Sequence, residues 1–129
     1  CNKETLDKII SFAKIFSENV ILMKSDRRLV CHLSAIFANN FTNHLIFNSE
    51  EILKKFNINP DILQPLIHET ISKIKSISTS AAQTGPAVRN DLITIKKHLR
   101  FLKNNNLNNN ADIYKVLSDS IIKNKQNEL

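Results

Sequence analysis

A first group of polar side chains with catalytic potential interrupts an otherwise apolar stretch. On a helical wheel, four of its residues fall within roughly 60° of one another, and a fifth, Asn40, lies about 80° from His32. The four are Arg28, His32, Asn39 and Asn43. An imidazole exchanges protons and amides orient polar ligands, but each costs about 1–3 kcal/mol when buried without a partner. The stripe therefore needs a ligand, water, a hydrogen-bonded core network, or solvent at a domain rim, and these alternatives stay open.

A second group occupies residues 84–91, which read T-G-P-A-V-R-N-D. Gly85 is the only glycine in the chain and allows the backbone to approach a ligand closely. The Thr84 hydroxyl and the Arg89 guanidinium can both donate hydrogen bonds to an anion. An ordinary loop, in which Arg89 pairs with a nearby carboxylate, is the alternative.

The composition excludes several kinds of site. With one glycine, neither the G-x-G-x-x-G nor the G-x-x-x-x-G-K-[ST] phosphate loop can be written, so this chain cannot cradle a pyrophosphate by itself. Cys1 and Cys31 do not make a disulfide framework, and Cys31 is expected to be a small buried apolar residue. Because no C-x-x-C or H-x-x-x-H pair is present, no metal site is expected.

The net charge and the lengths of the apolar runs limit which kinds of partner the chain can have. The chain has 129 residues, with 18 basic and 12 acidic, a formal net charge of +6. The lysines are scattered and are accompanied by one tyrosine and no tryptophan, so we expect no nucleic-acid partner. Nucleic-acid binding through the net positive charge stays a third candidate function. No apolar run is long enough to span a membrane, and the first residues do not resemble a signal peptide, so we expect a cytoplasmic protein without a membrane partner.

The periodicity predicts an all-α fold, a helical bundle around one long central helix. Helices are expected over 3–18, 25–56, 60–78, 92–103 and 112–123, with Ser25, Asn59 and Asp91 as N-caps and loops over 76–86 and 104–110. The first half of the long helix is apolar around most of its circumference, which predicts burial by several neighbours.

Residues 20–23, V-I-L-M, read instead as a short strand. One strand cannot satisfy its own backbone hydrogen bonds, and the rest of the sequence supplies no partner. This segment is the first indication that the chain is part of a larger protein.

Both polar groups match a known pattern. Residues 32–41, H-L-S-A-I-F-A-N-N-F, resemble the H-x-A-A-x-F-A-S-N-F stretch of a helical C-terminal domain of unknown function (number 2520). Residues 84–91, followed by Thr94 and His98-Leu99, are similar to that family's T-G-P-x-x-R-x-D-x-x-T-x-x-x-H-L. The resemblance covers about residues 24–103, and Asn39 stands where the family pattern has serine.

The resemblance implies a reaction class and an organisation. Members look like predicted NADP-dependent oxidoreductases, in which a Rossmann domain precedes this one and relatives include pyrroline-5-carboxylate reductase and 6-phosphogluconate dehydrogenase C-terminal-like domains. Residues 1–23 would then be a remnant of the Rossmann domain, its last helix and strand, and residues 24–129 a substrate-binding and homodimerising domain. The fragment would be inactive without its nucleotide-binding half.

Site roles follow from the same resemblance, with the active cleft between the two domains. His32 and Asn40 would be catalytic and lie near the nicotinamide, and Asn39 would contact the cofactor. A small-molecule substrate would be held by Thr84, Gly85 and Arg89. A non-enzymatic helical dimeric interaction module is the alternative from another class.

Overall fold

The computed structural model describes residues 2–127, and among these it contains helices, turns and loops but no strand. This confirms the predicted all-α class. The chain divides into two compact units, Cys1–His44 and Leu45–Leu129. The predicted domain boundary at residues 23 and 24 is not tested by this division and stays a prediction.

The first unit begins with α1 (Lys3–Lys14), which is shorter than predicted. The Asn2 side chain caps it by accepting a hydrogen bond from the Thr5 N–H at 2.8 Å. The apolar face of α1 is only partly covered, because Leu6, Ile10 and Ala13 are half-buried whereas Phe12 and Phe16 are 64% and 75% exposed.

The strand predicted over residues 20–23 is not formed, and residues 19–24 lie outside any helix or strand. The physical reason is that no second strand exists among residues 2–127 to pair with it. Ile21 and Leu22 consequently project their side chains into solvent, at 74% and 63% exposure.

The long central helix is confirmed as an unbroken helical run, but with a π-helical interruption that the periodicity did not reveal. It consists of α2 (Ser25–Ala35), the π-helix η1 (Ile36–Phe41) and α3 (Thr42–Lys55). The Thr42 Oγ1 donates to the Phe37 carbonyl at 3.4 Å across the widened turn. The border between the two compact units falls inside α3, after His44.

The predicted burial of this run is wrong for the chain as described. No residue of α2 or η1 is buried, and the apolar side chains of Leu33 and Phe37 are 54% and 63% exposed. Cys31, expected in a core, is exposed as well, and its thiol donates to the Met23 sulfur at 3.4 Å. The described residues supply too few neighbours to cover a helix that is apolar on so many sides.

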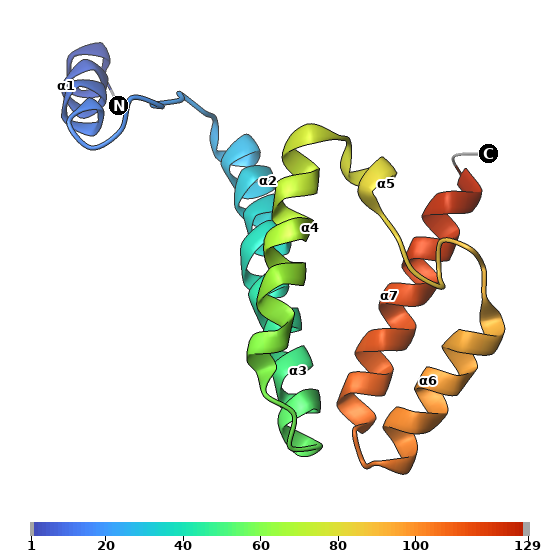
Figure 1. Ribbon diagram of the computed structural model, residues 1–129. Helices are drawn as coiled ribbons and strands as arrows, with labels where there is room; N and C mark the ends of the chain where they lie inside the picture. Colours follow the sequence, from blue (N-terminus) through green and yellow to red (C-terminus); the bar gives the residue numbers. More distant parts are fainter. Residues whose placement is uncertain (1, 128–129) are drawn as a thin grey trace. The chain divides into compact units, whose positions relative to one another are not determined.

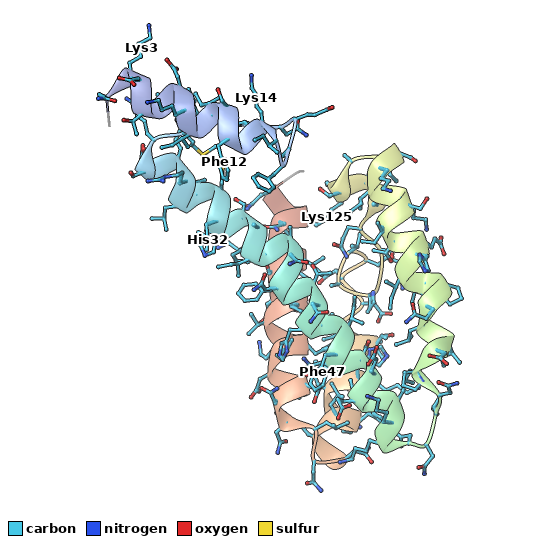
Figure 2. All side chains as sticks on the ribbon, turned by 90° about the vertical axis from the view of Figure 1, so that its left-hand side faces the viewer. Lys3, Phe12, Lys14, His32, Phe47 and Lys125 are labelled. Carbon is cyan, nitrogen blue, oxygen red and sulfur yellow. The ribbon has the colours of Figure 1, made fainter. Side chains whose placement is uncertain are left out.

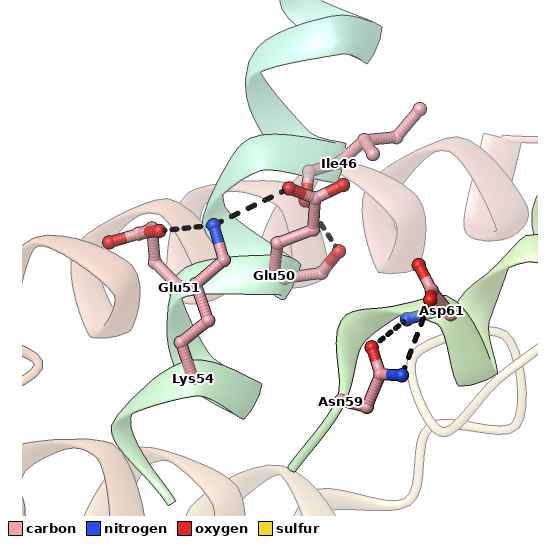
Figure 3. A network of polar contacts seen from close by, with 7 residues as sticks. Ile46, Glu50, Glu51, Lys54, Asn59 and Asp61 are labelled. Atoms are coloured by element: carbon pink, nitrogen blue, oxygen red, sulfur yellow. Dashed lines mark hydrogen bonds and ion pairs between the residues drawn. The ribbon is translucent and has the colours of Figure 1, made fainter. Parts of the chain in front are cut away.

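The second unit continues from α3 through a tight reversal into the 3₁₀ turn η2 (Pro60–Leu63) and α4 (Gln64–Ser76). Asn57 ends α3 in the left-handed region at φ 56°, with the Ile58 N–H reaching back to the Leu53 carbonyl. The predicted cap is confirmed, because the Asn59 Oδ1 accepts from the Asp61 N–H at 3.0 Å (Figure 3).

The last helices pack as an antiparallel pair, which Figure 1 shows side by side. They are α6 (Leu92–Asn104) and α7 (Asn108–Asn127), and a four-residue helix α5 (Thr79–Ala82) lies within the predicted loop 76–86. Their seam contains buried Ile95, Leu102 and Ala111.

The predicted loop 104–110 is shorter than expected, because asparagine closes the turn as glycine would. Asn106 adopts φ 56°, and the Leu107 N–H bonds the Leu102 carbonyl at 2.9 Å, which is a Schellman motif. Helix α7 can therefore begin at Asn108 rather than at residue 112.

Candidate functional site

The first predicted group lies on the surface of the first unit. His32 is an exposed residue of α2, and its ring projects from the helix in Figure 2. Asn39 and Asn40 are exposed residues of η1. Among residues 2–127, the side chains of these three have no hydrogen-bond partner, so imidazole and amides are available to a ligand.

The π-helix changes which polar residues share a face. A π turn holds about one residue more than an α turn, so residues near the end of the segment are rotated backward by up to about 100° relative to an uninterrupted helix. Asn40, predicted about 80° from His32, is thereby turned toward the His32 side of the helix, and Asn39 is turned away from it. The stripe drawn on a regular wheel is corrected accordingly.

The location of the interruption is itself informative. Single π turns inside α-helices occur frequently at functional sites, where they re-aim side chains at a cost in helix regularity. Here the π turn contains Asn39 and Asn40, two of the residues for which a binding or catalytic role is predicted. The roles themselves stay predictions.

The second predicted group lies in a loop of the second unit that is held by hydrogen bonds between its own backbone groups. Gly85 has a backbone φ of 109°, which residues that carry a side chain rarely adopt. A Cβ added at this position would meet no atom within 4 Å. Glycine is needed there for its backbone and not for space. The Asp91 N–H bonds the Pro86 carbonyl at 2.9 Å, and Ala87 is buried at 5% exposure, so the loop is anchored from within.

Part of the motif in this loop is structural. The Asp91 carboxylate caps α6, accepting from the Thr94 N–H at 3.0 Å and from the Thr94 hydroxyl at 2.7 Å. These hydrogen bonds, with a smaller contribution from the Arg89 charge, hold the pKa of Asp91 below its ordinary value. Thr84 and Arg89 remain exposed and can meet a ligand, and no ion pair joins Arg89 to a carboxylate among the described residues.

Two hollows of the second unit flank the residues that lead into this loop. One, of about 340 Å³, is lined by Thr84 and Gln83 together with residues of α4 that include the Glu69–Lys73 ion pair. The other, of about 490 Å³, contains Gln83 and Val88 and extends along α7 to Ile121 and Asn124. The hollow beside Thr84 gives this loop room for a small molecule.

The two predicted groups belong to different compact units. His32, Asn39 and Asn40 lie in Cys1–His44, whereas Thr84, Gly85 and Arg89 lie in Leu45–Leu129. Within each unit the residues are close in sequence and lie in one continuous helical run or in one loop. A common site formed by both groups stays a prediction.

Residues 1–121 match the family described as Domain of unknown function (DUF2520). The chain belongs to this family. The match extends beyond the two motifs and includes α1 and most of α7.

A solved structure resembles this DUF2520 chain closely. It is the crystal structure of a protein described as a putative NADP oxidoreductase from Bacteroides fragilis, with a TM-score of 0.87 and 37% sequence identity. The alignment covers 95% of this chain and 46% of the solved one, so the DUF2520 chain spans less than half of that protein. No curated protein matches.

One polar pair in the DUF2520 chain was missed by the sequence reasoning. His98 is exposed, and its Nδ1 lies 2.9 Å from the Tyr114 hydroxyl, which joins α6 to α7. The separation of 16 residues is too long for helical periodicity to reveal, and only a packed helix pair brings the two together.

Residues 2–127 contain no cluster of three or more histidine, cysteine or acidic side chains that could hold a metal ion. None of the helices in this range is both long enough and apolar enough to cross a bilayer.

Proposed function

We propose that this chain is the substrate-binding and dimerisation domain of a cytoplasmic NADP-dependent oxidoreductase. The observation that carries the proposal is the fold and sequence similarity to 46% of a protein described as a putative NADP oxidoreductase. A nucleotide-binding domain elsewhere in the intact protein would complete it.

The sequence of this chain supports the assignment of cofactor binding mainly to a separate nucleotide-binding domain. Its single glycine lies in a turn before α6, and no glycine-rich loop leads into any helix. Dinucleotide pyrophosphates are held by such loops at helix N-termini, so the cofactor's phosphates belong to another domain. The exposed apolar faces of α1 and of residues 21–22 support a covering domain next to them.

The residues present fit the nicotinamide end of the cofactor. The exposed amide of Asn40 can hydrogen-bond a carboxamide, and His32, on the same side of the helical run, can donate or accept a proton. The exposed amide of Asn39, which is turned away from that side, would contact another part of the cofactor. When bound, the cofactor supplies a hydride. His32 would give a proton to the reduced substrate, Asn40 would orient it, and Thr84, Gly85 and Arg89 would hold its polar or anionic part.

Dimerisation is supported by the uncovered face of α2 and η1. Leu33, Phe37 and Phe41 are 54%, 63% and 49% exposed, and the rings of Phe37 and Phe41 meet edge-to-face with centroids 5.0 Å apart. Contiguous exposed apolar surface of this kind marks interaction sites. A second copy would cover it and so restore the burial that the sequence predicts.

The proposal is tested by NADPH binding. The chain of residues 1–129 alone is expected to bind NADPH at least about 100-fold more weakly than the intact protein, because it lacks the phosphate-binding loop. Isothermal titration calorimetry of both proteins measures the difference.

The same titration separates the alternative, a non-enzymatic helical dimeric module, which the exposed face of α2 and η1 also favours. A dimeric intact protein that binds no NADPH would establish that alternative. Tight binding by residues 1–129 alone would show that the division of labour is wrong.

A further inference from the structure

The outward side of α6 carries a concentration of positive charge. The helix contains no acidic residue, and its four cationic side chains, all exposed, are Lys96, Lys97, Arg100 and Lys103. Spacings of four and three residues place Lys96, Arg100 and Lys103 on one face over about 10 Å of axis, with Lys97 at its edge. The buried Ile95 lies on another side of the helix, toward α7.

This face differs from four other charged helices, each of which pairs at least one of its lysines. Helices α1, α3, α4 and α7 each hold a lysine against an acidic residue three or four positions away. Figure 3 shows Lys54 between Glu50 and Glu51, which raise its pKa, chiefly through the hydrogen bond to Glu51.

In α6, by contrast, no ion pair is formed by the four cations with any described residue. Like charges three and four residues apart repel and weaken a helix, so an external anion would relieve this repulsion.

The same face exposes an apolar side chain. Ile93 is 84% exposed and lies about 60° from Lys96 on the helix, and the neighbouring Leu92 is 48% exposed. A phosphate backbone would neutralise the cations but offer nothing to Ile93, and the chain has one tyrosine and no tryptophan for base stacking. A lipid–water interface accommodates cations and an apolar side chain together.

We propose that this face of α6 docks on an anionic bilayer surface. Lys96, Lys97, Arg100 and Lys103 contact headgroup phosphates, and Ile93 enters the interface between them. Such binding is peripheral and reversible. The expectation of no membrane partner rested on the absence of a spanning segment, which does not bear on a charged surface.

Vesicle sedimentation tests the proposal. The chain is expected to partition onto vesicles containing phosphatidylglycerol but not onto pure phosphatidylcholine, and added salt should release it. Lys96→Gln with Arg100→Gln should lower the partition coefficient about 30-fold, since each cation contributes about a five-fold factor near such a surface. Ile93→Ser should lower it about five-fold at unchanged charge.

The matched control is Lys55→Gln with Lys75→Gln, which removes the same charge from exposed positions of α3 and α4. It should cause a much smaller loss. Lys97→Gln with Lys103→Gln gives a second variant of the face, and circular dichroism verifies the helix content of each. Equal losses from control and α6 variants would overturn the proposal. So would binding to a DNA oligonucleotide without binding to anionic vesicles, or no partitioning at low salt.

Discussion

Replacing His32 with alanine in the intact protein is expected to lower kcat by about 100-fold or more, the range typical of a lost general acid. The side chain is exposed on α2 without a hydrogen-bond partner among the described residues, so its loss should leave the fold intact. NADPH oxidation with an accepted substrate measures kcat, and thermal unfolding verifies the fold.

His68→Ala is the matched control, because His68 is an exposed histidine of α4 outside both predicted groups. It should leave kcat unchanged. Asn40→Ala should lower kcat as His32→Ala does, since the π turn rotates Asn40 toward the His32 side of the helix. A His32→Ala protein with normal kcat and a normal pH profile would remove His32 from the mechanism.

Introducing charge on the exposed face of α2 and η1 is expected to abolish dimerisation. Leu33→Asp with Phe37→Asp should raise the dimer dissociation constant by about 1,000-fold or more, because an unpaired charge buried in an interface costs several kcal/mol. Sedimentation equilibrium of the chain measures this constant directly.

Ala35→Asp is the control for that pair, since Ala35 is exposed on the opposite side of the same helix. It should leave the dimer intact. If both proteins dissociate alike, or if the unsubstituted chain is a monomer, this face is covered by something other than a second copy.

Helix identity and most of the capping were predictable because they depend on local chemistry. The predicted cap at Ser25 is wrong, since α2 begins at Ser25 and Lys24 occupies the N-cap position without a side-chain hydrogen bond. Asn59 and Asp91 cap the helices that follow them, as their side-chain oxygens and positions require. Helix lengths were less predictable at the C-terminal ends of helices. After α6, Asn106 adopts the left-handed conformation and ends the helix in a tight turn, whereas the asparagine-rich composition predicts only a loop.

The π turn could not be read from the sequence. Apolar side chains recur through residues 36–41 much as they would in an α-helix, and a widened turn depends on a balance of backbone bonds that periodicity does not report. The π turn changes only the helix face on which the following residues lie, and it places Asn40 but not Asn39 on the His32 side.

Burial was the largest error, and its cause is physical. Leu33, Phe37 and Cys31 have the composition of a core, but composition gives only the need for a neighbour and not its source. Prediction of the candidate site from the sequence has the same limit. Residue types indicated His32 and Arg89, and the structure shows both side chains exposed, but a shared cleft depends on parts of the protein beyond each compact unit.

Hydride transfer by the intact protein is the most direct test of the proposed oxidoreductase function. NADPH carrying deuterium at the nicotinamide C4 is incubated with the protein and a metabolite extract, and mass spectrometry follows the label. We predict that deuterium appears in a small molecule in proportion to the NADP⁺ formed, and that transfer stops when residues 1–129 are deleted. Deuterium that never leaves the bound cofactor, or transfer that is unaffected by the deletion, would contradict the assignment.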